Sequence, residues 1–447
     1  QGGNPGANTL GSPAGLFYDG SKLYVADLSN YRILVYNSIP IVNNVSADLV
    51  IGQSNMSNNL ADHGGTPSAN GLDYPLEAYS DGQKLYIVDY KNNRVLIYNS
   101  IPTSNNASAD VVIGQEDFTH KSANQGGSVG ANTLYQPTSV YVYGNKLFIV
   151  DSGNNRILIF NTIPTSNNAS ADVVIGQADF THQSANQGGS VRANTLYYPR
   201  GVYSDGTRLF IADTYNNRIL IYDDIPSSNN ASADLVIGQA DMTHRNSSVT
   251  ANTLYSPSSV YVDNSNIYVS DTDNNRVLIY NSIPEENNAP ADVVVGQVDM
   301  TSRESFDDAT ANNIGYAVSA ISDDTRLYIL DSYFNRILIY NSIPTSNNAS
   351  ADVVIGQPDM TSNDDNQGGN VGANTLDTDW DYNKISINSD KLFIADSYNN
   401  RVLIYPLGPQ NPTFSTTVEN QQTTINLNLS SSDDTKEYIV AENPDFT

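Results

Sequence analysis

The sequence predicts an all-β fold, a seven-bladed β-propeller of four-stranded antiparallel blades. Three observations predict it: one unit recurs seven times, four short strand patterns fit within a complete unit, and no stretch has a helical period. Four-stranded units repeated around an axis form the propeller architecture. An open solenoid of sheets would need capping repeats with polar outer faces, whereas both ends of this chain resemble interrupted blades.

The repeat is marked by the pattern D-x-x-N-x-R, or a near variant, followed by an apolar run. It places one Asp/Arg pair in each unit: Asp27/Arg32, Asp89/Arg94, Asp151/Arg156, Asp213/Arg218, Asp271/Arg276, Asp331/Arg336 and Asp396/Arg401. A second marker, ANTL or a near variant, also occurs seven times, but a third, AD-[VL]-V-[IV]-GQ, occurs six times. The mismatch indicates that one blade lacks a fourth strand.

The strands of one unit can be placed in order on the fourth copy. The Asp205-Gly206 dipeptide is a hairpin turn signal between the first and second strands. A tight turn at Tyr215-Asn216-Asn217 separates the second strand from the third, and asparagine tolerates the left-handed conformation that such turns need. The predicted strands are GVYS (201–204), RLFIAD (208–213), RILIYD (218–223) and DLVIGQ (234–239).

The run P-x-G-V-x-x-D-G-x-x-L-Y-V-A-D-x-x-N-N-R-V-L-I-Y resembles an NHL repeat, with good examples at 13–36 and 199–222. The resemblance extends over residues 1–407 in seven copies and implies a β-propeller, although NHL domains usually have six blades and shorter units. The family includes protein- and RNA-binding modules and, more distantly, metal-dependent lyases. The resemblance therefore does not choose between these functions.

The domain boundary is placed where the last repeat ends. Residues 1–407 are expected to form the propeller, and residues 408–447 either a linker or the start of a fibronectin-type or immunoglobulin-like β-sandwich. The first ten residues align with 125–134, which follow a fourth strand in another copy. We therefore expect a strand upstream of them to complete the seventh blade. The alternative donor is the segment 413–430, and KEYIVAENPDF (436–446) is a further candidate strand.

The charge balance restricts the partners. The chain carries 48 acidic and 21 basic side chains, a formal net charge of −27, which repels phosphate backbones and gives no attraction to anionic lipid. We therefore expect no nucleic-acid binding and no direct membrane insertion. The chain contains no cysteine, which excludes disulfides, thiolate metal sites and cysteine nucleophiles.

Strand order predicts which loops share a face. In an up-and-down blade, the second-to-third turn and the connection to the next blade emerge on one side, which we name the long-loop face. The connections between blades are the longest loops, as in residues 178–199. Long loops on a rigid scaffold are where repeat proteins usually bind partners. We expect a protein or glycan partner on this face, and further domains of the same chain.

The Asp/Arg pairs allow two interpretations. The aspartate ends one strand and the arginine opens the next, so a bidentate ion pair can form across the turn. A ring of ligand-binding arginines is one hypothesis. The other is structural support of the turns, and it is favoured because the pair occurs in every copy.

Two groups of residues are candidate metal ligands. His120, His182 and His244 recur in equivalent loops of successive blades, which favours surface histidines inherited by duplication over a zinc site. The segment Asp271–Asn275 alternates oxygen ligands as calcium loops do, but it lacks the glycine and distal glutamate of an EF-hand. We expect no metal site and no cofactor, with calcium as the one alternative.

The candidate binding residues lie where the repeat loses its symmetry. Copies six and seven both lack the usual proline, and copy seven contains the only tryptophan. Because sites usually break the symmetry of a scaffold, we single out Tyr316, Asp379, Trp380 and Tyr382 as a binding patch; sequence drift beside a seam is the alternative.

No catalytic constellation is found in the sequence. We therefore predict a non-catalytic binding and scaffold module, extracellular or on the cell surface. The alternative is a metal-dependent lyase or hydrolase with a site in the central channel, although the predicted first strands, such as EAYS, SVYV and SAIS, offer almost no metal ligands.

Overall fold

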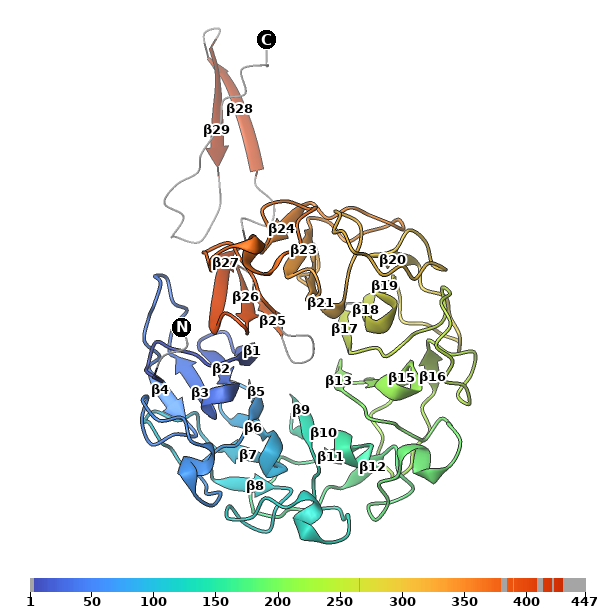
Figure 1. Ribbon diagram of the computed structural model, residues 1–447. Coiled ribbons are helices and arrows are strands. Elements are labelled where there is room, and N and C mark those ends of the chain that lie inside the picture. Colours follow the sequence, from blue (N-terminus) through green and yellow to red (C-terminus); the bar gives the residue numbers. More distant parts are fainter. Residues whose placement is uncertain are drawn as a thin grey trace.

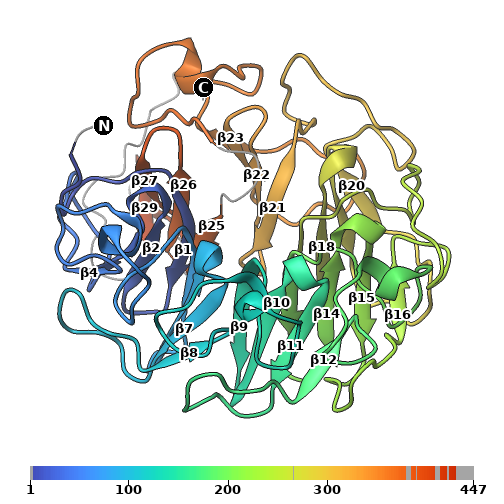
Figure 2. The ribbon, with the colours of Figure 1, turned by 60° about the horizontal axis from the view of Figure 1, so that its bottom comes forward.

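The computed structural model describes residues 4–264, 266–378, 384–388 and 390–407, together with two strands at 413–419 and 422–428. It confirms the predicted fold class, an all-β seven-bladed propeller. The blades surround a central axis, with the first strand of each blade innermost (Figure 1). Figure 2, turned by 60°, shows the strands of the blades from the side and the loops that extend from both ends of the ring.

Strand bounds follow the repeat closely. The first three blades are β1–β4 (Pro13–Tyr18, Leu23–Asp27, Arg32–Tyr36, Leu49–Ile51), β5–β8 (Pro75–Ser80, Leu85–Asp89, Arg94–Tyr98, Val111–Ile113) and β9–β12 (Pro137–Tyr143, Lys146–Asp151, Arg156–Phe160, Val173–Ile175). Blades four to six are β13–β16 (Gly201–Ser204, Leu209–Asp213, Arg218–Tyr222, Leu235–Ile237), β17–β20 (Ser259–Asp263, Asn266–Asp271, Arg276–Tyr280, Val293–Val295) and β21–β24 (Ala317–Ser322, Leu327–Asp331, Arg336–Tyr340, Val353–Ile355). The seventh blade is β25–β27 (Ile385–Ile387, Lys391–Asp396, Arg401–Pro406).

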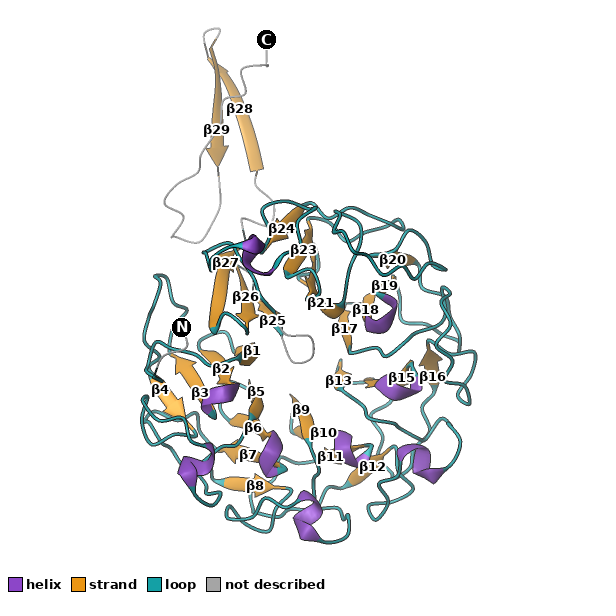
Figure 3. Cartoon of the chain, viewed as in Figure 1, coloured by secondary structure: helices purple, strands orange, loops and turns teal. Residues whose placement is uncertain are grey.

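The helical elements of the described residues are single 3-10 turns, spread around the ring (Figure 3). Five lie between the second and third strands: Leu28–Asn30, Tyr90–Asn92, Ser152–Asn154, Thr214–Asn216 and Thr272–Asn274. Each is followed by a left-handed residue. In four turns it is an asparagine, such as Asn217 with φ 57°, as predicted, and in the first blade it is Tyr31 with φ 54°. Four lie in connections between repeats, at Ala61–Gly64, Ala123–Gly126, Ala185–Gly188 and Asp365–Gly368. None of the described helices is long and apolar enough to cross a membrane.

Strand alternation explains how the blades pack. In β14, Leu209 and Ile211 join the apolar core shared with the preceding blade, whereas Phe210 and Ala212 join the core shared with the following blade. Successive side chains of a strand point to opposite faces of the sheet. Each central strand is therefore buried on both faces, and the core of the molecule is a ring of layers between neighbouring blades.

The seventh blade has three described strands, in the order β25-β26-β27, whereas the other six have four. This agrees with the count of six fourth-strand motifs. The tail strands β28 (Thr413–Glu419) and β29 (Gln422–Asn428) pair with each other as a separate two-stranded sheet. They do not supply the fourth strand in this structure, and the candidate strand at 436–446 lies outside the described residues.

Candidate functional site

Every Asp/Arg pair forms an ion pair across the turn between the second and third strands. The Arg Nε–Asp Oδ2 distances lie between 2.6 and 2.9 Å. In blade four, Asp213 Oδ2 also accepts from Asn216 Nδ2 at 2.8 Å, and Asp213 Oδ1 accepts from the backbone N–H of Tyr197 at 2.7 Å. Burial raises the pKa of the Asp213 carboxyl, although the Arg218 charge acts in the opposite direction.

The expected bidentate geometry is not what the structure contains. Only Nε of Arg218 contacts the aspartate, because the other two guanidinium nitrogens donate to backbone carbonyls of the long connections. Nη1 donates to Met242 O at 2.9 Å, and Nη2 donates to Arg192 O at 2.9 Å and Thr195 O at 2.7 Å. The arginine therefore ties the turn to the connections on either side of the blade, and these loops share the predicted face.

The same face carries a ring of paired positions, which we name the platform. One position is the residue directly after the ANTL marker, and the other is the second residue of the following turn. In blades one to five and seven, the turn residue donates its backbone N–H to the carbonyl of the loop residue, at 2.9 to 3.2 Å. The pairs are Gly11/Ser29, Asp73/Lys91, Tyr135/Gly153, Tyr197/Tyr215, Tyr255/Asp273, Gly315/Tyr333 and Asp377/Tyr398.

Platform side chains change from blade to blade, while the Asp/Arg pair beneath them does not. Tyrosine occupies at least one of the two positions in blades three to seven. Tyr135, Tyr215, Tyr333 and Tyr398 are 36, 42, 44 and 55% exposed. These tyrosines were not among the binding residues predicted from the sequence, although variation beside a constant motif is a signal that could have found them.

Blade four has the largest aromatic group on the platform. The Tyr215 ring stacks on Tyr198, with centroids 5.1 Å apart and an angle of 16° between the planes. It meets Tyr197 edge-on, also at 5.1 Å. The Arg200 guanidinium lies 6.0 Å from the centroid of the Tyr198 ring. In blade five, Arg303 lies over the Tyr255 ring at 4.8 Å.

On the seventh blade, the platform position Asp377 has a pKa raised to about 6, because burial and the charges of Asp365 and Asp396 disfavour its ionisation. A carboxyl whose pKa is higher in the folded than in the unfolded chain contributes stability below about pH 3.8, and loses it as the pH rises through about 6. We expect Asp377→Asn to stabilise the protein at pH 7, by about 1 kcal/mol after allowance for solvent screening.

Urea denaturation of the wild type and the variant at pH 7 and pH 4 measures this. The advantage of the variant should be largest at pH 7 and small at pH 4, where the Asp377 side chain of the folded protein is neutral and that of the unfolded chain is about half ionised. An equal difference at both pH values would contradict the assigned pKa.

The predicted binding residues of copies six and seven are only partly placed. Asp379, Trp380 and Tyr382 lie outside the described residues, so their proximity stays a prediction. The Tyr316 ring is half-buried and packs against the core between blades six and seven, and its backbone N–H donates to Asp331 Oδ1 at 3.1 Å. Tyr316 therefore lies beside the Asp331/Arg336 turn, one residue after the platform position Gly315.

The recurring histidines lie at the surface. Nδ1 of His120, His182 and His244 each lies 2.7 to 2.8 Å from the carboxylate of the aspartate three residues earlier. Both carboxylate oxygens of Asp271, the first residue of the calcium-like segment, accept hydrogen bonds from protein groups. Among the described residues, no group of three or more His, Asp or Glu side chains is arranged to hold a metal ion.

Near the axis, an ion pair links β5 of the second blade to the residue that precedes β25 of the seventh. Lys384 Nζ lies 2.6 Å from Glu77 Oε1. Glu77 Oε2 also accepts from the backbone N–H of Val140, at 3.2 Å. Glu77 therefore connects blades two, three and seven, and its charge is compensated by Lys384.

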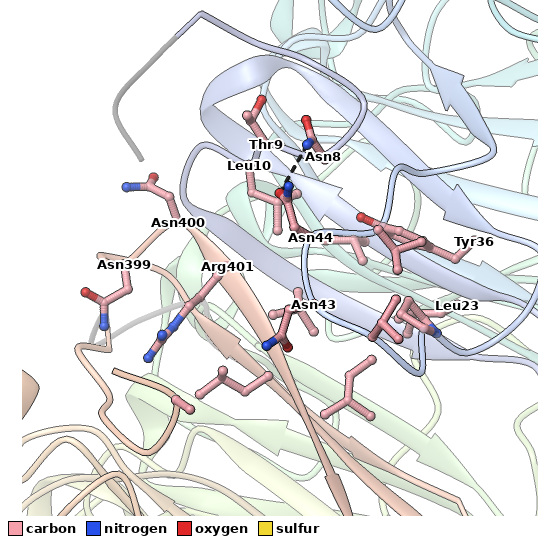
Figure 4. Close-up of a pocket in the computed structure, with 18 of the residues that line it drawn as sticks. Asn8, Thr9, Leu10, Leu23, Tyr36, Asn43, Asn44, Asn399, Asn400 and Arg401 are labelled. Atoms are coloured by element: carbon pink, nitrogen blue, oxygen red, sulfur yellow. Dashed lines mark hydrogen bonds between the residues drawn. The ribbon is translucent and has the colours of Figure 1, made fainter. Parts of the chain in front are cut away.

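A groove of about 900 Å³ lies at the junction of the seventh and first blades (Figure 4). One wall is β27. The other is formed by Leu23, Val25 and Tyr36 of the first blade and by the loop 40–45. Asn8 Nδ2 donates to Asn44 Oδ1 at 3.1 Å across its rim. We name this the seam groove.

No protein-family model and no curated protein matches the chain. Solved structures with a similar course of the chain include a streptogramin B lyase (9% identity, TM-score 0.48, 90% of this chain and 96% of that one). A catalytically inactive virginiamycin B lyase from Staphylococcus aureus with quinupristin has 10% identity and a TM-score of 0.47, over 89% of this chain and 94% of that one. A computationally designed protein, Ika8, has 7% identity and a TM-score of 0.46, over 91 and 100%. These values are too low to transfer a function.

Proposed function

We propose that this protein is a non-catalytic binding module that presents its platform tyrosines to a protein or glycan partner. The observation that carries the proposal is the contrast between a constant Asp/Arg turn in all seven blades and side chains that vary directly above it. Variable side chains on a rigid scaffold are the usual arrangement of a recognition surface.

Tyrosine suits such a surface for physical reasons. It offers a large, stiff contact area together with a hydroxyl group, and it loses little conformational entropy when it is fixed by a partner. Its ring can stack on the apolar face of a sugar or on the side chains of a protein. The Tyr198–Tyr215 stack in blade four is formed without a partner, so partner binding has less to fix there.

Other expectations belong to this proposal. From the resemblance of the repeats to the NHL pattern, we infer that the chain is related to NHL propellers. We also infer an extracellular or cell-surface location from the acidity of the chain, its near-identical copies and its long connecting loops. The tail as the start of an Ig-like domain is also part of the proposal. A strongly negative surface favours a neutral or basic partner over a nucleic acid.

We expect Tyr215→Ala to weaken partner binding about tenfold, which corresponds to about 1.4 kcal/mol, because it removes the exposed ring from the blade-four group. A glycan array and an array of surface proteins from the host identify the partner, and titration of the two proteins measures the loss. The matched control is Tyr143→Ala. Tyr143 is 45% exposed but ends β9, on the face opposite the platform.

Equal losses for the two variants, or a loss confined to Tyr143→Ala, would move the binding surface away from the platform. Thermal melting of both variants checks that neither change acts through the fold. Both rings are exposed, so we expect their melting temperatures to stay within a few degrees of the wild type.

A further inference from the structure

The seam groove is the place where one blade lacks an interaction that the other six make. In six blades the third strand pairs with a fourth strand over three residues, as Ile33, Leu34 and Val35 do with Ile51, Val50 and Leu49. In the seventh blade, β27 pairs with β26, and no described strand pairs with its outer edge. The corresponding residues Val402, Leu403 and Ile404 line the groove.

The facing loop of the first blade has matching hydrogen-bonding groups. Between successive blades from one to six, a fourth-strand valine donates its N–H to an asparagine side chain of the next blade. Val50 N, for example, donates to Asn105 Oδ1 at 3.0 Å, and its carbonyl accepts from the backbone N–H of Asn106, also at 3.0 Å. Asn43 and Asn44 hold these positions in the first blade, and both line the seam groove.

Apolar side chains that are buried in the other blades are more exposed to solvent at the seam groove. The leucine of the ANTL marker, as Leu134, is fully buried because it packs on the glycine after a fourth strand. Leu10, its counterpart at the seam, is only partly buried and lines the groove. Val371 is 54% exposed, whereas its equivalents Val129 and Val191 are 6 and 5% exposed.

The arginine of the seventh blade makes fewer hydrogen bonds than its counterparts in the other blades. In the other six blades, arginine Nη1 donates to a backbone carbonyl just beyond the fourth strand, as Arg336 Nη1 does to Met360 O at 3.0 Å. Among the described residues, Arg401 donates hydrogen bonds to Asp396 and Thr375, and its side chain is 23% exposed where the other six are buried.

The rim adds apolar residues of its own. Where the equivalent loop of blade two has Thr103 and Ser104, the first blade has Ile41 and Val42, which are 86 and 66% exposed. Apolar residues that replace polar ones beside an open sheet edge are typical of a contact surface.

We propose that the seam groove is a strand-acceptor site for an extended peptide with the fourth-strand pattern A-D-V-V-I-G-Q-x-D-[FM]. The three apolar residues pair with β27, as in β-strand addition. The glycine takes a positive φ and packs on Leu10. The glutamine amide donates to the carbonyls of Asn399 and Asn400, as Gln115 Nε2 does to Asn92 O and Asn93 O.

The arginine and the loop complete the site. The carbonyl of the last residue of the pattern accepts from Arg401 Nη1, and the backbone of the middle valine bonds to Asn43 and Asn44. The occupant is thus defined by six internal copies of the same contact. In the first blade, the first aspartate of the pattern, Asp48, accepts from the backbone N–H of Asn37 at 2.7 Å. This aspartate is less important at the seam, because Pro406 holds the position of Asn37 and has no N–H. The site is independent of the blade-four platform.

Fluorescence anisotropy with a labelled peptide of residues 349–361 (ASADVVIGQPDMT) tests the proposal on the full chain. We expect saturable one-to-one binding. The same peptide with Gly356→Val should not bind, because valine has a side chain where Leu10 lies and disfavours a positive φ. In the protein, Asn43→Ala should weaken binding at least fivefold. Asn105→Ala, the same change where the acceptor is already used by Val50, should leave peptide affinity unchanged.

Several outcomes would overturn the proposal: no binding at about 1 mM peptide, equal binding of the valine peptide, or equal effects of Asn43→Ala and Asn105→Ala. Size-exclusion chromatography with and without peptide distinguishes another occupant. A dimer that binds no peptide and is broken by Ile41→Asp in the groove rim would mean that the groove is covered by a second copy of the chain. Melting curves of both variants confirm that they are folded at the temperature of the titration.

Discussion

Asp213→Ala is expected to lower the free energy of unfolding by about 3–5 kcal/mol, the loss typical of breaking a buried ion pair. Arg218 has no exposed side-chain surface, so water cannot replace the missing carboxylate. The change also removes the acceptor of the Tyr197 N–H and of the Asn216 amide. Three donors would thus lose a partner at once, those of Arg218 and Asn216 buried and that of Tyr197 partly buried, while Arg218 would stay fixed by its three carbonyl contacts.

The matched control is Asp396→Ala in the seventh blade. Arg401 is partly exposed and borders the seam groove, so water can solvate it when the carboxylate is removed. We expect a smaller loss, about 1–3 kcal/mol. Urea denaturation of both variants at pH 7 measures the difference. Equal losses would show that burial of the arginine does not decide the effect, and an unchanged Asp213→Ala variant would mean that these pairs do not stabilise the turns.

The sequence predicted the ring because the repeat imposes the same period-two burial seven times. The strands of blade four were expected at 208–213 and 218–223 and are found at Leu209–Asp213 and Arg218–Tyr222. The fourth strands are shorter than their motif: β16 covers Leu235–Ile237, because the following Gly238 has a φ of 90° that ends the strand.

The geometry of side-chain contacts could be predicted from the sequence only in part. A carboxylate and a guanidinium five residues apart predict contact, but the bidentate form was wrong because the carbonyls that bind Arg218 come from residues 192, 195 and 242. Such long-range partners are set by how the loops pack, and no local pattern contains them. For the same reason, counting motifs predicted an open seventh blade, but not which groups line the seam groove.

Gly114→Ala is expected to cost about 2–5 kcal/mol, as the sum of two effects. Gly114 has a φ of 96°, and an L-residue forced to positive φ loses about 1–2 kcal/mol. A Cβ at this position would also lie 2.6 Å from Leu134 Cδ1 and 2.9 Å from the Asn93 carbonyl oxygen, and overpacking of a filled core costs about 1–3 kcal/mol more. Urea denaturation measures the total.

Gly82→Ala, in the same blade, separates the two effects. Gly82 has a φ of 85°, but a Cβ built there meets no atom within 4 Å. Its loss should therefore contain the backbone term alone, about 1–2 kcal/mol. If both variants lost the same stability, the contact with Leu134 would contribute nothing. The glycine after each fourth strand would then be required only for its backbone, and the seam groove would have no steric reason to reject a peptide with valine in its place.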